Sequence, residues 1–208
     1  MMLPTHALGG MALGLVVGAV VPEFAGIALV AGLFGGILPD LDMYAGHRQT
    51  LHFPVYYSVL ALGALVPALL VPSPATVGSA VFLLGAATHS LADVFGGGLE
   101  LRPWEGTSDR AVYDHYRSQW IAPRRWVGYD GSPGDLVLSM ALAGPLLLRV
   151  DGVFRDAVVA SVAVGVLYTA VRRFLPDLAE VLFGTLLPVL PRRLHERVPD
   201  RYLQSHSR

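Results

Sequence analysis

The feature that most constrains this chain is a series of apolar segments that carry almost no charge. Residues 7–21 and 24–38 contain no charged side chain, and only Pro22 and Glu23 separate them. A helix needs roughly 20 apolar residues, about 30 Å at 1.5 Å per residue, to cross the hydrocarbon core of a bilayer. The pattern predicts an all-α, polytopic membrane bundle of about six spans: 7–21, 24–38, 53–71, 75–95, 134–150 and 153–171.

Composition agrees with a membrane location. Of the 208 residues, 53% are hydrophobic and 15% are charged, against about 25% charged in soluble domains. The net charge of −1 provides no field that would attract nucleic acid, so membrane lipids are the expected partners. The chain has no cysteine, which excludes thiolate metal sites and cysteine nucleophiles.

The first two segments are each short for a span, and we expect them to form a tight helical hairpin. Small residues recur at every fourth position in both: Gly10, Gly14 and Gly18 in the first, and Ala28, Gly32 and Gly36 in the second. Small residues at this spacing allow helix backbones to approach closely in lipid. The spacing therefore predicts a direct contact between the two helices.

The remaining organisation is read from the polar segments. We expect residues 1–190 to form a single membrane-embedded domain, with a polar aromatic loop at 96–133 that lies over the membrane surface and contains a short helix near 108–119. Residues 177–190 are too short for a confident span, and an interfacial helix is expected there. Residues 191–208 are a polar tail. No basic n-region precedes the first span, so we expect it to be retained rather than removed as a signal peptide.

Alternation of the spans places the N-terminus, the 39–51 loop and the 96–133 loop on one side. That side carries most of the arginines: Arg48, Arg102, Arg110, Arg117, Arg124, Arg125, Arg172 and Arg173. The opposite turns carry Arg149 and Arg155. Because positively charged loops remain in the cytoplasm, we expect a multi-pass protein of the cell membrane with this side facing the cytoplasm.

The same alternation brings a set of histidines and aspartates to that side. Candidate metal ligands are His6, Asp40, Asp42, His47, His52, His89 and Asp93. His89 and Asp93 are four residues apart and share one face of a helix. Mixed imidazole and carboxylate ligands suit a divalent transition metal, with zinc favoured and manganese or iron as alternatives.

A bound ion would activate water or polarise a phosphoryl oxygen. Arg48 is the candidate substrate contact, since a guanidinium binds phosphate through paired hydrogen bonds. Asp42 or His52 would serve as a general acid if it is not a ligand, so both are kept as catalytic candidates with Arg48. The pair Asp114-His115 is interpreted as surface.

The candidate site residues also have purely structural interpretations. Asp40 and Asp42 follow Pro39 and are also typical turn and cap residues. His47 and His52 would be ordinary loop histidines on their own, and His6 a polar residue before a span. The pair of His89 and Asp93 is harder to explain structurally, because a buried charge in an apolar helix needs neutralisation.

Taken in order, these motifs resemble a known family. Thr5-His6, Leu38-Pro39-Asp40-Leu41-Asp42, His47-Arg48 with His52, and His89 with Asp93 are similar to the membrane-bound metal-dependent hydrolases described as LexA-binding and inner-membrane-associated. The resemblance covers about residues 3–105. One departure is local: the family pattern H-R-x-x-T-H is HRQTLH here, with Leu51 directly before His52.

A weaker likeness is to zinc-dependent phospholipase C, through the helical pair His89-x-x-x-Asp93. The resemblances imply a metal-dependent hydrolase, and we expect it to cleave a phosphoester, such as a lipid headgroup, at the cytoplasmic face. The alternative is a non-catalytic membrane scaffold or regulatory protein with a structural metal or polar cluster. A transporter is disfavoured, because the later spans have almost no polar residues in their middles.

Overall fold

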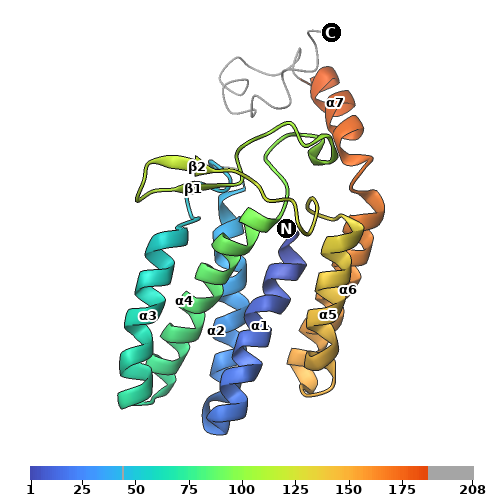
Figure 1. The fold of residues 1–208 in the computed structure, drawn as a ribbon. Coiled ribbons are helices and arrows are strands. Elements are labelled where there is room, and N and C mark those ends of the chain that lie inside the picture. The colour runs from blue at the N-terminus through green and yellow to red at the C-terminus, as the bar shows by residue number, and fades with distance from the viewer. Residues whose placement is uncertain (44, 187–208) are drawn as a thin grey trace.

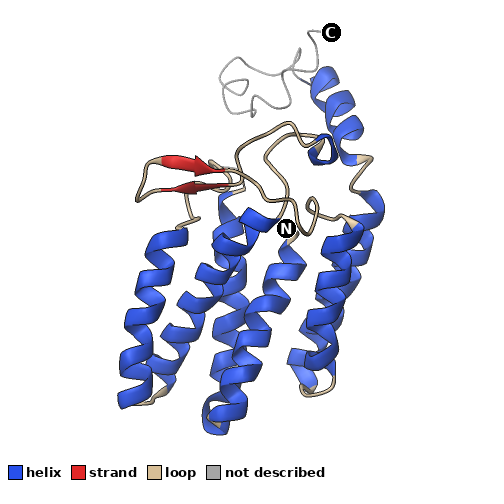
Figure 2. Cartoon of the chain, viewed as in Figure 1, coloured by secondary structure: helices blue, strands red, loops and turns tan. Residues whose placement is uncertain are grey.

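The structure is a computed structural model that describes residues 1–43 and 45–186. The predicted tail at 191–208 lies outside this part of the chain. The described residues are mostly helical, with one small antiparallel hairpin (Figures 1 and 2). The long helices are α1 (Leu3–Val20), α2 (Ala25–Ile37), α3 (Pro54–Leu70), α4 (Pro74–Ala92), α5 (Pro133–Leu147), α6 (Gly152–Val171) and α7 (Leu175–Leu186).

Short 3-10 turns extend several of these helices. They are η1 (Pro22–Phe24), η2 (Leu38–Asp42), η3 (Asp93–Phe95) and η4 (Pro103–Glu105). Helices α1, α3, α4 and α5 each have a proline at one of their first two positions, where its missing N–H has no helical partner to lose. Ser73 and Ser132 cap α4 and α5 by accepting the backbone N–H of Thr76 and Asp135.

Within residues 1–43 and 45–186, four helical segments are long and apolar enough to cross a membrane. They are Leu3–Val20, Pro22–Asp42, Pro74–Phe95 and Gly152–Val171. The apolar helices α3 and α5 are shorter, with 17 and 15 residues. We expected the first two segments to be the short ones; instead, α1 begins at Leu3, and 3-10 turns lengthen α2 at both ends.

Helices α1 and α2 are in direct backbone contact, as the small residues predict. A Cβ placed on Gly10 would meet the carbonyl oxygen of Gly32, and one on Gly36 would meet the carbonyl oxygen of His6. Helix α4 packs against the same surface, because a Cβ on Gly85 would meet backbone atoms of Gly32 at 3.0 Å. The absence of side chains at these positions brings His6 next to the end of α2.

The polar loop contains a hairpin where we expected a helix near 108–119. Strand β1 (Val112–Asp114) pairs antiparallel with β2 (Gln119–Ile121). Tyr113 and Trp120 lie opposite each other with ring centroids 5.4 Å apart, and aromatic cross-strand pairs stabilise such ladders. The Asp114 carboxylate accepts the N–H groups of Tyr116 and Arg117 and so closes the turn, a role that favours a turn over a helix at this point.

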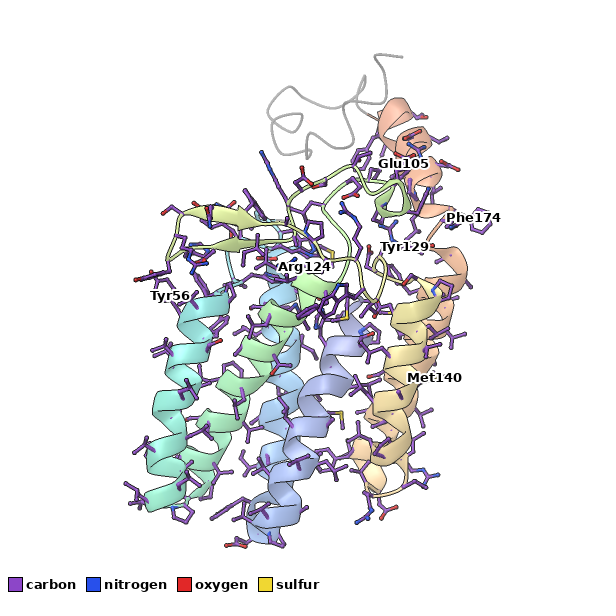
Figure 3. All side chains as sticks on the ribbon, viewed as in Figure 1. Tyr56, Glu105, Arg124, Tyr129, Met140 and Phe174 are labelled. Carbon is purple, nitrogen blue, oxygen red and sulfur yellow. The ribbon has the colours of Figure 1, made fainter. Side chains whose placement is uncertain are left out.

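The end of the loop is bound to the end of α4. Arg124 donates its N–H to the carbonyl of Val94 at 2.7 Å, and Val127 donates to the carbonyl of Phe95 at 3.1 Å. These carbonyls lie at a helix C-terminus and have no partner within the helix. The loop is therefore attached directly above the site-bearing end of α4, where Figure 3 labels Arg124.

The predicted C-terminal helix is present as α7, and it extends past the loop end of the bundle (Figure 1). Arg102 of the loop pairs with Asp177 at 2.9 Å and with Glu180 at 2.7 Å. Exposed apolar side chains include Phe174, directly before α7, and Leu178 within it. An interfacial position for this helix stays a prediction.

Candidate metal centre

Four side chains from separate elements meet at the loop end of the bundle. Asp40 lies in η2, His52 lies two residues before α3, His89 lies in the last turn of α4, and Asp93 begins η3. One ligand atom from each lies within 4.8 Å of the others, and all four residues are buried. Nitrogen and oxygen atoms are concentrated at this end of the molecule, whereas side chains along the helices are mostly carbon (Figure 3).

The distances between these atoms fit a small cation. His89 Nε2 lies 3.4 Å from Asp40 Oδ1 and 3.6 Å from Asp93 Oδ2. His52 Nε2 lies 3.3 Å from Asp93 Oδ2 and 3.8 Å from Asp40 Oδ1. Four ligand atoms placed tetrahedrally at bond lengths of 2.0–2.1 Å around zinc would be separated by about 3.3–3.4 Å. The arrangement therefore has nearly the dimensions of a tetrahedral site.

The protonation of both imidazoles follows from their outer contacts. His89 Nδ1 lies 2.6 Å from the carbonyl oxygen of Gly36, and His52 Nδ1 lies 2.9 Å from Asp42 Oδ2. A carbonyl or carboxylate oxygen accepts hydrogen bonds, so Nδ1 carries the proton in each neutral ring. The lone pair of each ring is then on Nε2, which points into the cluster, and this is the arrangement typical of metal-binding histidines.

The atoms facing the centre of the cluster lack hydrogen-bond partners among the described residues. Nε2 of His52, Nε2 of His89 and Oδ2 of Asp93 are buried and unsatisfied. A buried polar atom without a partner costs about 1–3 kcal/mol. With neutral imidazoles, the two nitrogens and two carboxylate oxygens are all acceptors, and the nearby donor is the Arg48 Nε–H, 3.3 Å from Asp93 Oδ2; the excess of acceptors suits a cation. The residues fit a metal ion, and imidazole nitrogens combined with carboxylate oxygens suit several divalent transition metals.

Asp42, a predicted ligand, lies behind His52 rather than in the four-residue group. Its Oδ2 accepts from His52 Nδ1 and from the Leu51 N–H at 3.0 Å. Its Oδ1 accepts from the Arg48 N–H at 3.3 Å and contacts His47 Nδ1 at 3.1 Å. With both oxygens engaged, Asp42 is placed to orient His52.

The two other predicted ligands contact the group from outside. His47 is only partly buried, and its Nδ1 contacts the carboxylate of Asp42. His6 stacks on His89 with ring centroids 3.6 Å apart and an angle of 15° between the planes. His6 Nε2 also lies 3.0 Å from Asp93 Oδ1, so His6 supports both ligands that α4 and η3 provide.

Arg48 is buried beside the cluster. Its Nε lies 3.3 Å from Asp93 Oδ2, and its Nη1 donates to the carbonyl of Gly97 at 2.7 Å. Burial lowers the pKa of Arg48, but the charge of Asp93 outweighs it and keeps that pKa above its ordinary value. The guanidinium is therefore charged. The amino group of Met1 also contacts Asp93 Oδ1.

The charge balance at the centre favours a cation. Three buried carboxylates, those of Asp40, Asp42 and Asp93, lie here, and the two cations paired with them, the Arg48 guanidinium and the Met1 amino group, both contact Asp93. Buried charge without compensation is unfavourable. A divalent ion would supply the positive charge that the side chains lack.

Residues that sequence reasoning missed hold α1 in place. The Asp135 carboxylate, fully buried at the start of α5, accepts from the Met2 N–H at 2.7 Å, the Thr5 hydroxyl at 2.7 Å and the Gly131 N–H at 3.0 Å. Thr5 directly precedes His6, so this contact fixes the position of His6 beside His89. A lone carboxylate at the start of an apolar segment was the available signal.

Comparisons with protein-family models, curated proteins and solved structures found no match.

Proposed function

We propose that this chain is a membrane-embedded, metal-dependent hydrolase that acts on a phosphoester at one face of the membrane. One observation carries the proposal: two Nε2 lone pairs and two carboxylate oxygens converge, largely unpaired, at the end of an apolar helical bundle. Intramembrane ionisable residues are costly and mark functional sites.

The roles follow from the contacts. Asp40, His52, His89 and Asp93 would hold the ion, and Asp42 would orient His52. When bound, a divalent metal supplies Lewis-acid polarisation of a phosphoryl oxygen and activation of water. The contacts of Arg48 use Nε and Nη1, and a guanidinium has five N–H groups, so Arg48 can also donate to a phosphate oxygen.

The resemblance to the LexA-binding, inner-membrane-associated hydrolases supports the same proposal. Its motif residues are distant in sequence, yet the ligands and their supporting histidines lie together in the fold. We further propose about six spans, with α3 and α5 as the shorter ones, and a site on the cytoplasmic side, because the arginines gather in the loops at that end. A lipid headgroup phosphate is the substrate that this location favours.

The first test is the metal content of the detergent-purified protein, measured by mass spectrometry. We expect one or more tightly bound transition-metal ions in the parent and their loss in His89→Ala. Thr88→Ala is the matched control, because Thr88 is the exposed neighbour on the same helix, and it should retain the metal. A parent that stays metal-free after incubation with zinc and manganese would refute the proposal; a loaded parent justifies a phosphoester substrate screen.

A second candidate is a non-catalytic scaffold in which the cluster is structural. The contacts of Asp93 favour it, since Arg48 and the Met1 amino group already compensate the charge of this carboxylate without a metal. The two candidates predict different results for Arg48→Gln. A structural cluster should lose thermal stability in this variant, whereas an enzyme should lose phosphoester hydrolysis in protein that remains folded.

A further inference from the structure

The hairpin of β1 and β2 contacts a second loop, residues 45–53, which carries His52. Tyr113 donates its backbone N–H to the carbonyl of Arg48 at 3.0 Å. The next contact comes from a side chain: His115 Nε2 lies 2.7 Å from the carbonyl oxygen of Gln49. A carbonyl oxygen only accepts, so His115 donates from Nε2.

Two aromatic neighbours hold the His115 ring. Its centroid lies 4.5 Å from that of Phe53 and 4.9 Å from that of Tyr113. Phe53 directly follows His52, and Tyr113 belongs to β1. The imidazole therefore sits between the loop and the hairpin, and its orientation is defined by contacts on both.

The loop of residues 45–53 links the His115 contact to the candidate metal centre through Asp42. Arg48 has φ of +60°, a left-handed conformation that residues other than glycine adopt when outside contacts impose it. The N–H groups of Arg48 and Leu51 both donate to Asp42, and Asp42 in turn accepts from His52 Nδ1. Two carbonyls of the loop, those of Arg48 and Gln49, thus face the hairpin, and the N–H groups of Arg48 and Leu51 hold the carboxylate that orients His52.

We propose that His115 is a positioning residue for the candidate metal centre. Its hydrogen bond to Gln49 holds the loop in the conformation in which Asp42 directs His52 Nε2 toward the other three ligands. The part that concerns metal affinity rests on the proposed function, whereas the ordering of the loop does not. His115 touches neither the ion site nor any of the four ligands that would hold the ion.

The first measurement is the affinity of the detergent-purified full chain for Co²⁺, by competition with a chromophoric chelator, together with the visible spectrum of the bound ion. His115→Phe keeps an aromatic ring between Phe53 and Tyr113 but removes the donor. We expect it to bind Co²⁺ about threefold more weakly, less than the roughly tenfold loss for a group that contacts a ligand directly, with an altered spectrum. His115→Gln places an amide N–H at the same reach and should restore both.

Tyr116→Phe is the control, because the Tyr116 side chain is exposed on the same turn. It should match the parent. Equal Co²⁺ affinity and spectrum in the parent and His115→Phe, with loss of binding in His89→Ala, would overturn the role of His115 while leaving the metal site intact.

A second measurement does not depend on a metal. Amide hydrogen exchange in a peptide covering residues 47–52 should be about fivefold faster in His115→Phe than in the parent, the change that corresponds to one hydrogen bond. Unchanged exchange would overturn the positioning role. If the parent binds no Co²⁺, the proposed function fails, and the exchange experiment still decides whether His115 orders the loop.

Discussion

Replacing Asp42 with asparagine separates the two roles that a carboxylate can have at this site. The side chain accepts from four groups, the N–H groups of Arg48 and Leu51 and the imidazoles of His47 and His52. Asparagine keeps the shape but offers one oxygen and one NH₂ group. Whichever way the amide turns, its NH₂ group faces at least one backbone N–H that needs an acceptor.

The expected losses follow from these contacts. One buried N–H without an acceptor should destabilise the protein by about 1–3 kcal/mol. Loss of a partner that orients a ligand weakens metal binding by about 10- to 100-fold, and the lower value is expected here because the amide oxygen can still accept from His52. Removing a ligand is more severe, since about 10–16 kcal/mol shared among four ligands is roughly 2.5–4 kcal/mol each. Asp40→Asn should therefore reduce metal affinity by about 100- to 1000-fold.

The assay is zinc affinity in detergent by chelator competition, with the thermal unfolding of the metal-free protein measured beside it. Asp42→Asn should bind zinc about tenfold more weakly than the parent, and Asp40→Asn should bind zinc more weakly than Asp42→Asn. Equal losses in the two variants would refute the reasoning and make Asp42 a ligand. If Asp42→Asn binds zinc as tightly as the parent, Asp42 has no role in metal binding.

Three further results are expected. Gly36→Ala should lower stability by about 1–3 kcal/mol, because the added Cβ would meet a carbonyl of α1. Gly26 faces open space, so Gly26→Ala should be neutral or stabilising by up to about 1 kcal/mol. Thermal unfolding checks both variants, and equal effects would contradict the close contact between α1 and α2. His47→Ala should reduce zinc affinity by less than about tenfold, and a loss as large as that of His89→Ala would place His47 among the ligands. Burial raises the pKa of Asp130, but the charge of Arg172 outweighs it and the pKa lies below its ordinary value, so the stability from this ion pair should be present above about pH 4 and be lost as the pH falls further. Unfolding measured against pH checks this, and Asp130→Asn should remove that part of the dependence.

Much of the helical frame was predictable because its signals are local. The apolar runs predicted where α3, α4 and α5 begin to within one residue, whereas α1 begins at Leu3, four residues before its predicted start. The small-residue spacing in the first two segments predicted their contact. The four-residue spacing of His89 and Asp93 likewise predicted a shared helix face, since a helix repeats every 3.6 residues.

Other features depended on contacts between distant parts of the chain. The hairpin near residue 112 replaces an expected helix because its outer edge and side chains bind the loop before α3. The anchor of α1 joins Thr5 to Asp135, which are 130 residues apart, and no spacing rule relates two such positions.

Asp40 and Asp42 show most clearly the difference between what local sequence patterns predict and what contacts between distant segments decide. The sequence by itself determined that carboxylates and histidines gather at one end of an apolar bundle, because hydropathy alone sets the order in which the helices alternate. It did not distinguish two aspartates that are two residues apart in the same turn. Only the tertiary structure directs Asp40 toward His89 and Asp42 toward His52 Nδ1, because the role of each carboxylate is decided by the donors that surrounding segments bring to it.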